Sequence, residues 1–287
     1  MAEIISKQIS EDGTKKYLLQ YEDGIQIETV LMTHAYGNSL CVSSQAGCNM
    51  GCMFCASGLL RKVRDLTAKE MLDQFHTVSK DLSEESLITH VVVMGTGEPF
   101  DNYAEVLQFC NLVSDPKTMG ETLAVAPRHI TVSTSGIIPK ILEFASTEKR
   151  FNLAVSLHAP TNDLRNRMMP VNRKYPVDEL VKSALRYSKQ TKRRVAFEYL
   201  LLDGINDSEK DALALADLLS FEGLDSSDYF YVNLIPYNPV REFGLRGSEK
   251  ETALKFYDVL MKQGIKATLR KEHGQDIAAA CGQLRLK

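Results

Sequence analysis

The stretch Cys41–Gly58 reads CVSSQAGCNMGCMFCASG and holds four of the six cysteines in a chain of 287 residues. Such a cluster can close disulfides, hold a zinc ion, or supply three ligands to a more reactive metal group and leave one thiol over. The opening residues MAEIISKQISEDG lack the apolar segment of a secretory signal, so we expect a cytoplasmic protein. In that reducing compartment, clustered cysteines more often bind metals or take part in catalysis than form disulfides. A set of disulfides is therefore the least favoured of the three.

Cys48, Cys52 and Cys55 have the spacing C-x3-C-x2-C within one loop. Structural zinc sites normally use four protein ligands, often from two separated pairs, and no second pair follows here. Electron-carrying four-iron clusters are held by four cysteines, so three cysteines leave one iron open to another ligand. The pattern therefore favours a catalytic iron–sulfur cluster, as in the radical S-adenosylmethionine (SAM) enzymes. A zinc site completed by Cys41 or a histidine is the alternative.

Composition sets wide limits. The chain is 44% hydrophobic and 25% charged, as in ordinary globular proteins, and its formal net charge is −3. A nucleic-acid partner would therefore have to bind local basic stretches, for which the candidates are 61–64, 192–194, 241–246 and 270–271. No apolar run is long enough to span a membrane, so we expect no membrane partner.

Periodicity predicts the architecture. Residues 3–33 contain three short strands divided by the turn signals EDGT and EDG, which predicts a small antiparallel element. From Ser39 onward, apolar strands alternate with amphipathic helices. The expected strands are 39–45, 90–95, 129–135, 151–158, 194–202 and 231–238, with IKATLRKE as a last one. The expected helices are near 67–80, 103–114, 137–147, 176–190, 207–221 and 248–263.

Six strand–helix units predict an α/β fold, a partial (β/α)6 TIM-like radical SAM barrel preceded by the antiparallel β element. Runs such as VVVM and LAVSL are apolar at consecutive positions, as in parallel strands covered on both faces. We expect residues 1–36 to form the antiparallel extension and residues 37–287 the barrel domain. Functional residues should lie at the carboxyl ends of the barrel strands.

Several motifs follow expected strands. Glycine lets a ligand approach the backbone, a carboxylate can bind an ammonium group, and small hydroxyls can bond a carboxylate or ribose. Each motif alone also fits a strand-ending turn or cap, and a lone histidine is more often a satisfied core residue than a ligand. The residues concerned are Gly97 and Glu98 in MGTGEP, Ser133 in STSG, Ser156, Leu157 and His158 in SLH, and Asn238 in IPYNP.

Cys281 lies near the end of the chain in DIAAACGQL. A cysteine among small residues is usually a small buried hydrophobe. The same surroundings suit a thiol that must react and then reach a substrate. Composition alone leaves both interpretations open. Cys110, on an apolar helix, is expected to pack in the core.

Taken in order, CVSSQ-x-GC-x3-C-x2-C, GEP, STSG, SLH, NLIPYNP and DI-x-AACGQL resemble the RlmN/Cfr family of radical SAM RNA adenosine methyltransferases. The resemblance runs from about Gln26 to Leu284, and CVSSQ and AACGQL are its most specific parts. It implies that Cys48, Cys52 and Cys55 bind a [4Fe–4S] cluster whose open iron is chelated by SAM. It also implies SAM contacts from Gly97, Glu98, Ser133, Ser156, Leu157, His158 and Asn238.

The same resemblance implies the chemistry, with two SAM molecules used per turnover. Cys281 takes a methyl group from one SAM, and a radical made from the second SAM removes a hydrogen from that methyl group. The carbon radical then adds to C2 of an adenine. Cys41 forms a disulfide with Cys281 as product leaves, and Glu28 removes the C2 proton. An isolated glutamate is otherwise usually surface, which is the competing interpretation of Glu28.

The resemblance thus predicts a 23S rRNA (adenine-C2)-methyltransferase of the dual-specificity rRNA/tRNA type. Alternatives are C8 methylation as in Cfr-type enzymes, a radical SAM enzyme with another substrate, and a non-catalytic zinc-binding protein. Flavodoxin or ferredoxin is the expected electron donor, and the protein is expected to act as a monomer. Family members usually carry a small N-terminal helical domain, which we expect to be missing from this chain.

Overall fold

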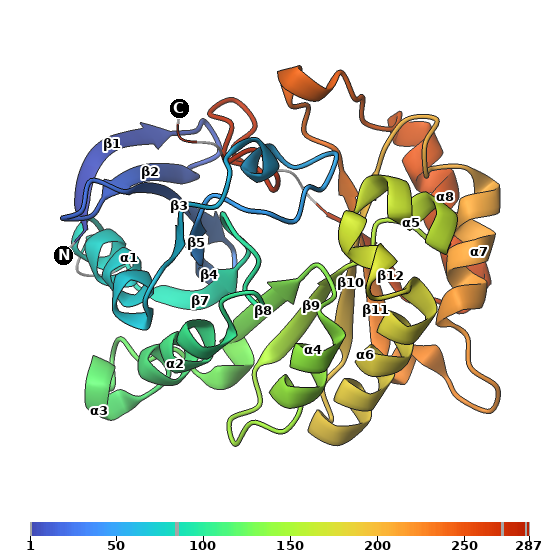
Figure 1. The fold of residues 1–287 in the computed structure, drawn as a ribbon, viewed down its shortest axis with the longest axis horizontal. Helices are drawn as coiled ribbons and strands as arrows, with labels where there is room; N and C mark the ends of the chain where they lie inside the picture. Colours follow the sequence, from blue (N-terminus) through green and yellow to red (C-terminus); the bar gives the residue numbers. More distant parts are fainter. Residues whose placement is uncertain (1, 84–85, 271–272, 285, 287) are drawn as a thin grey trace. The chain divides into compact units, whose positions relative to one another are not determined.

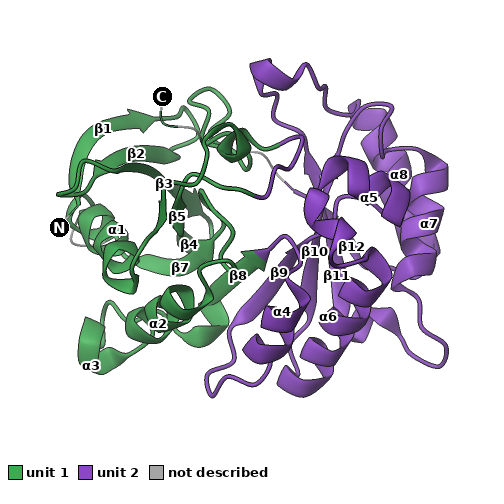
Figure 2. Ribbon diagram, viewed as in Figure 1, with its two compact units in different colours: residues 1–49, 55–133, 273–287 green, residues 50–54, 134–272 purple. Residues whose placement is uncertain are grey.

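The structure, a computed structural model, describes residues 2–83, 86–270, 273–284 and 286. The chain divides into two compact units, coloured separately in Figure 2. The first contains residues 1–49, 55–133 and 273–287, and the second contains residues 50–54 and 134–272. The last residues of the chain therefore return to the unit that holds the first ones.

The sheet of the first unit joins an antiparallel part to a parallel part (Figure 1). Its order is β1-β2-β3-β4-β7-β8, antiparallel up to β4 and parallel from β4 to β8. A separate short pair, β5 with β6, is antiparallel. The strands are β1 Glu3–Ile9, β2 Lys15–Gln20, β3 Gln26–His34, β4 Gly37–Cys41, β5 Gln45–Ala46, β6 Arg64–Asp65, β7 Ile88–Val93 and β8 Ile130–Thr134.

Two longer helices pack together in this unit, α1 (Ala68–Lys80) and α2 (Tyr103–Val113). Thr67 caps α1 with a capping box: its side chain accepts from the Glu70 amide, and the Glu70 carboxylate accepts from the Thr67 amide. A short helix α3 (Pro116–Met119) and the 3-10 turns η1 (Ala56–Leu59) and η2 (Pro127–His129) complete the unit.

The second unit contains four parallel strands in the order β9-β10-β11-β12. All seven residues of β10 are buried, and all but Glu198 and the Tyr199 hydroxyl are apolar, as in a strand covered on both faces. The strands are β9 Asn152–Ser156, β10 Val195–Leu201, β11 Phe230–Pro236 and β12 Ala267–Leu269. The helices are α4 Ile138–Phe144, α5 Asn162–Met168, α6 Val177–Thr191, α7 Glu209–Leu219 and α8 Lys250–Lys262, with 3-10 turns η3 Pro170–Arg173, η4 Ser226–Asp228 and η5 Arg241–Phe243.

The predicted α/β class, with an antiparallel element followed by alternating parallel strands and helices, is confirmed. The first barrel strand is shorter than expected, since β4 ends at Cys41 and the next residues turn into β5. The last strand covers only Ala267–Leu269 of IKATLRKE, whose residues 271–272 lie outside the described part of the chain. The boundary expected at residue 36 stays a prediction. None of the described helices is both long and apolar enough to cross a membrane.

Candidate active site

The cysteine triplet occupies the loop between β5 and η1. Cys48 and Cys55 belong to the first unit and Cys52 to the second. The Cys48 amide donates to the Leu60 carbonyl at 2.9 Å. Gly47 has a φ of 81°, and a Cβ there would lie 2.3 Å from the Arg61 carbonyl oxygen, so only glycine fits at the entry to the loop.

The surroundings of Cys55 suit a metal-bound thiolate. The side chain is half-buried, and burial raises the pKa of its thiol. Hydrogen bonds from the Ser57 hydroxyl and from the Ser57 and Gly58 amides act against that rise, because they stabilise negative charge on sulfur. The charge of Cys281 is a further, smaller cause that raises this pKa.

The three loop cysteines fit a cluster by their chemistry. Each is half-buried, and three thiolates on one loop form the incomplete donor set that leaves one iron open. Among the described residues, no group of three His, Cys, Asp or Glu side chains is arranged around a single metal ion. A four-iron cube holds its thiolates farther apart than one ion does, so this finding bears on a single-ion site and leaves the fit to a cluster intact.

The C-terminal loop (residues 273–284) runs along the segment that follows Cys55. The Ala56 amide donates to the Gly282 carbonyl at 2.7 Å, and the Ser57 hydroxyl donates to the Leu284 carbonyl at 3.3 Å. Just before these anchors Cys281 is exposed, whereas Ala279 and Ala280 are buried. The loop therefore holds its backbone in place and presents the thiol.

Cys41 is buried at the end of β4, and its neighbours come from the same C-terminal loop. It packs in one apolar cluster with Ala279 and Leu284, two and three residues from Cys281. Val30 and Met32 of β3 complete the buried part of this cluster. The structure thus brings the surroundings of Cys41 and Cys281 together, although about 240 residues separate them in sequence.

Glu28 on β3 is 1% exposed, so the surface interpretation of this residue is wrong. Its Oε1 lies 3.4 Å from Nζ of Lys16, which is also buried. Its Oε2 accepts a hydrogen bond from the Leu286 amide at 3.2 Å. Buried carboxylates need such partners, and here one of them belongs to the C-terminal segment.

The motifs CVSSQ and GTGEP fold against each other. The Ser43 hydroxyl donates to the Glu28 carbonyl at 2.6 Å and accepts from the Thr96 amide at 2.9 Å. A Cβ on Gly97, whose φ is 116°, would lie 2.7 Å from atoms of Ser44 and Gln45. Both sequence motifs are therefore explained in part by this close backbone approach.

Glu98 is buried, and Gln45 is the residue that fixes its position. The Glu98 amide donates to the Gln45 side-chain oxygen at 2.9 Å, and Glu98 Oε1 accepts from the Phe100 amide at 2.9 Å. The Gln45 side-chain nitrogen in turn donates to Asp65 and Asp101. Sequence reasoning gave Gln45 no role, although its place in CVSSQ was the available signal. Ser133 lies half-buried in β8, one residue before the end of that strand.

In the second unit, Ser156, Leu157 and His158 close β9. His158 is buried, and its Nδ1 accepts from the Leu200 amide at 3.0 Å. Burial, together with the positive charge of Arg165, lowers the pKa of His158 to about 3. The ring is therefore neutral at physiological pH, and with Nδ1 accepting, its proton is on Nε2. His158 can donate a hydrogen bond from Nε2 but cannot act as a base through Nδ1.

Arg165 on α5 was not singled out from the sequence, yet it ties two strand ends together. The side chain is fully buried and donates to the carbonyl oxygens of Ser135, Ser156 and Leu157 at 2.6, 2.9 and 3.0 Å. It also donates to the Asn172 side chain at 3.1 Å. These acceptors compensate for burying a charge. No sequence signal was available, because a single arginine in a short helix usually reads as surface.

Asn206 lies just before α7 but does not cap it. Ser208 caps α7, and Asn206 instead donates to the carbonyl oxygens of His158 and Leu200 at 2.8 and 2.6 Å. It also accepts from the Leu202 amide at 2.8 Å. Asn206 therefore holds His158 at its positive φ of 57°. Asn238, predicted to contact SAM, is buried just after β11.

Glu198 on β10 is another buried residue that the sequence did not indicate. It pairs in register with Ser156 of β9 and Asn233 of β11. The Asn233 side chain donates to Glu198 Oε1 at 3.0 Å, and an Arg270 nitrogen lies 3.8 Å from Glu198 Oε2. Burial raises the pKa of Glu198, and the Arg270 charge and the Asn233 bond only partly counter this effect.

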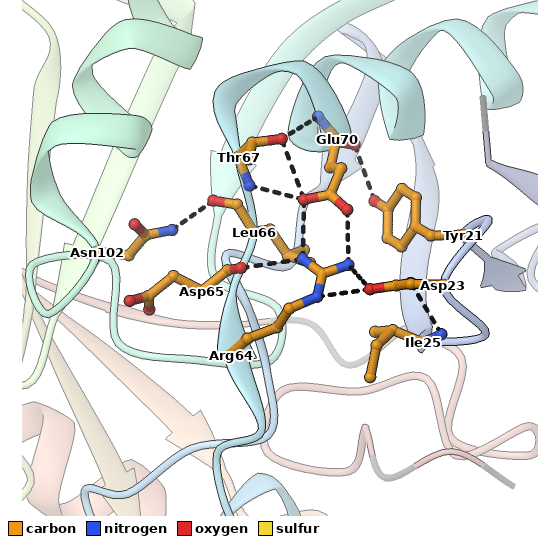
Figure 3. Close-up of polar contacts among 9 residues, drawn as sticks. All are labelled: Tyr21, Asp23, Ile25, Arg64, Asp65, Leu66, Thr67, Glu70 and Asn102. Carbon is orange, nitrogen blue, oxygen red and sulfur yellow. Dashed lines mark hydrogen bonds and ion pairs between the residues drawn. The ribbon is translucent and has the colours of Figure 1, made fainter.

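The basic stretch 61–64 is mostly neutralised inside the protein. Arg64 forms paired contacts with Glu70 and an ion pair with Asp23 (Figure 3). Lys62 pairs with Asp65 and Asp101, each at 2.8 Å. Most of the charge in this stretch therefore serves the fold. Of the other candidates, Arg270 contacts Glu198, and Lys271 lies outside the described residues.

Comparison with known proteins gives the class and then the family. Residues 42–216 match the model of the Radical SAM superfamily, so fold and cysteine loop define a radical SAM enzyme, with a [4Fe–4S] cluster and SAM as its cofactors. A crystal structure of a radical SAM methyltransferase from Sphaerobacter thermophilus matches with a TM-score of 0.93 and 42% identity, covering 100% of this chain and 82% of that one.

Similarity to curated proteins identifies the family within the radical SAM class. The probable dual-specificity RNA methyltransferase RlmN of Enterococcus faecalis is 52% identical over 284 residues, covering 98% of this chain and 77% of that protein. The protein of the same name from Listeria welshimeri is 51% identical, with 98% and 75% covered. The chain belongs to the RlmN family, as the sequence motifs predicted.

Proposed function

We propose that this protein methylates C2 of an adenosine in 23S rRNA, and an adenosine in tRNA, through a methyl-cysteine formed on Cys281. The relatives are named dual-specificity RNA methyltransferases, which supports RNA of two kinds as substrate. The observation that carries the proposal is the C-terminal loop. It presents an exposed Cys281 while its flanks lie against Cys41, against the segment after Cys55, and against Glu28.

Cys48, Cys52 and Cys55 hold the cluster, which when bound supplies the electron that cleaves SAM to a 5′-deoxyadenosyl radical. Gly97, Glu98, Ser133, Ser156, Leu157, His158 and Asn238 contact SAM. The proton on His158 Nε2 makes this residue a hydrogen-bond donor to SAM, which agrees with its acceptor bond at Nδ1. Gln45, Arg165 and Asn206 position these residues through the contacts described above.

Two SAM molecules are used per turnover. The Cys281 thiolate first attacks the methyl carbon of one SAM. An S–C bond to Cys281 forms as S-adenosylhomocysteine leaves, a step that needs an exposed thiolate. The second SAM gives methionine and 5′-deoxyadenosine, the latter after a hydrogen is removed from the methyl group on Cys281. The resulting carbon radical adds to C2 of adenine and joins RNA covalently to the protein.

Glu28 and Cys41 release the product. The adduct radical would return one electron to the oxidised cluster and give its C2 proton to the Glu28 carboxylate, which Lys16 holds by charge. The Cys41 thiolate then attacks the Cys281 sulfur, so that an S–S bond forms as the S–C bond breaks. The released carbon takes up a proton and becomes the new methyl group. A two-electron thiol reductant then reduces the disulfide, becoming oxidised itself, and restores both thiols.

Partners follow from this chemistry. A one-electron donor such as flavodoxin or ferredoxin supplies the cluster, and the protein acts as a monomer. RNA contacts come from basic residues that the fold does not neutralise. Arg241, the first residue of η5, is exposed and is the candidate here, whereas the exposed Arg246 pairs with Asp203 at 3.3 Å.

Mass spectrometry of nucleosides from RNA treated with the anaerobically reconstituted protein tests the proposal. We expect 2-methyladenosine, which a transcript lacking the target adenosine does not yield. A C8-methylated product would instead assign the Cfr-type activity. A colourless protein with stoichiometric zinc and no cleavage of SAM would assign the non-catalytic alternative.

A further inference from the structure

We infer that the turn of the first β-hairpin is a positioning element for Cys281, an inference that rests on the methyl-carrier role proposed above. The hairpin turn (residues 10–14) joins β1 to β2 near the start of the chain. In Figure 1 the red C-terminal segment passes beside this blue hairpin, within the same unit. Nothing in the proposed chemistry involves these residues directly, yet most of their polar side chains contact the C-terminal loop.

The first contacts are made by Asp12. Its carboxylate accepts from the Gly274 amide at 3.1 Å and from the Thr14 amide at 2.9 Å, so one side chain bridges the turn and the start of the loop. Nδ1 of His273 lies 3.3 Å from the same carboxylate. Hydrogen bonds to the ionised form hold the pKa of Asp12 well below its ordinary value against the opposing effect of burial.

A second set of contacts lies two residues farther along the loop. The Ser10 hydroxyl donates to Asp276 Oδ1 at 2.6 Å, and the Glu11 amide lies 3.3 Å from Asp276 Oδ2. These bonds lower the pKa of Asp276, with the Ser10 bond the largest cause. Asp12 and Asp276 thus form reciprocal bonds, each carboxylate binding the backbone of the other segment.

Packing and the buried lysine complete the contact. A Cβ on Gly274 would lie 2.8 Å from Ala279 and 3.0 Å from Thr14, so the loop starts tightly against the turn. Lys16 Nζ lies 3.5 Å from the carbonyl oxygen of Ala278, as well as 3.4 Å from Glu28. Ala278 has a φ of 50°, an unusual conformation for alanine that neighbouring contacts must maintain.

The consequence concerns where Cys281 can go. The loop is anchored on one side by Ala56 and Ser57, and on the other by the hairpin turn. Cys281 must meet SAM, the adenine and Cys41 in succession, so its loop needs a defined position rather than free motion. If one anchor is loosened, the radical formed from SAM should more often be lost without RNA methylation.

The test uses the full-length reconstituted protein with Asp12→Ala, Asp276→Ala and the double variant. Asp12→Asn is the partial variant, because its single amide oxygen can accept from Thr14 or from Gly274 but not from both, whereas the carboxylate uses a different oxygen for each. Asp225→Ala is the matched control: Asp225 also accepts from a backbone amide, that of Ser227, but in the other unit. Hydrogen exchange of peptides covering 274–284 is measured together with the ratio of 5′-deoxyadenosine to methylated 23S rRNA fragment.

We expect the double variant to exchange at least about fivefold faster in 274–284, as loss of one hydrogen bond implies. Its ratio of 5′-deoxyadenosine to methylated RNA should rise severalfold, with Asp12→Asn between the double variant and wild type, and Asp225→Ala close to wild type. Unchanged exchange or an unchanged ratio in the double variant would overturn the inference. Absence of methyl-cysteine from the wild-type protein would instead overturn the proposed function. In that case the exchange data would still show whether the hairpin turn holds residues 274–284 in place. The single Asp276→Ala variant changes only an exposed side chain and gives the same readout if the double variant folds poorly.

Discussion

The amide nitrogen of Ala56 lies 2.7 Å from the carbonyl oxygen of Gly282. This bond joins the residue after Cys55, a proposed cluster ligand, to the residue after Cys281, the proposed methyl carrier. The two cysteines are close enough for the charge of Cys281 to raise the pKa of Cys55. The fold therefore places Cys281 and the residues after it beside the segment that follows Cys55.

Replacing Cys41 by alanine should trap the reaction at the covalent stage. Without the Cys41 thiolate, the S–C bond between Cys281 and RNA has no nucleophile to break it. We expect a protein–RNA adduct that survives denaturing electrophoresis and is removed by nuclease. The control is Cys110→Ala, since Cys110 is buried in α2, where burial raises the pKa of its thiol to about 12. An adduct-free Cys41→Ala enzyme with normal turnover contradicts the resolving role.

Glu28→Gln should lower RNA methylation by about 100-fold or more, the usual contribution of a general base. Methylation of Cys281 itself should stay within about twofold, because Glu28 has no part in that step. The change also leaves Lys16 buried without its charge partner, which can cost about 3–5 kcal/mol. Mass spectrometry of protein and RNA separates the two methylation steps.

The double variant Lys16→Met/Glu28→Gln distinguishes catalysis from stability. It removes both charges, so the free energy of unfolding should recover toward the wild-type value. RNA methylation should remain low if Glu28 is the base. Recovery of both quantities together would show that Glu28 serves the fold alone.

His158 should remain neutral down to low pH. Its folded pKa of about 3 lies below the ordinary value of 6.5. Because the unfolded chain binds the proton more readily, the stability that neutral His158 provides is complete above pH 6.5 and is lost as the pH falls toward 3. In His158→Asn, which tolerates the positive φ, the loss of stability between pH 7 and 5 should be smaller than in wild type. If urea unfolding shows that wild type and His158→Asn lose the same free energy of unfolding between pH 7 and 5, this account is contradicted. NMR titration of the His158 ring gives its pKa directly.

Arg165→Met should destabilise the second unit by about 3–5 kcal/mol, because three buried carbonyl oxygens lose their donor. The pKa of His158 should rise at the same time, since the Arg165 charge helps to lower it. The matched control is Arg167→Met on the same helix, where the side chain is exposed and a change within about 0.5 kcal/mol is expected. Thermal unfolding and NMR of His158 measure the two effects. An Arg165→Met protein as stable as the Arg167 control would show that the carbonyls find other partners.

Periodicity predicted most of the fold because strands and helices of ordinary length carry a clear pattern. The helix expected near 67–80 is α1, and its cap was readable in Thr67 and Glu70. Short elements escaped prediction: α3 and α5 have four and seven residues, too few to show a helical repeat. The strand expected over 39–45 ends early, because Ser43 turns to bond with the backbone of Glu28 and Thr96.

The candidate site likewise contains residues that the sequence pointed to and residues that it did not. Residue types with distinctive spacing, such as the cysteine triplet, could be assigned from sequence through the family resemblance. Residues that act by burial could not, because Gln45, Arg165 and Asn206 are polar side chains whose partners are distant backbone atoms. The buried state of Glu28 was also hidden, since it depends on Lys16 and on a segment about 260 residues away.

The central claim is that Cys281 carries the methyl group to RNA. Protein incubated with SAM bearing a deuterated methyl group, then digested and analysed by mass spectrometry, tests it directly. We predict a deuterated methyl group on the peptide containing Cys281, and a methyl group on RNA that retains two deuterium atoms after the protein is mixed with unlabelled SAM. An unmodified Cys281 peptide alongside methylated RNA would contradict the account.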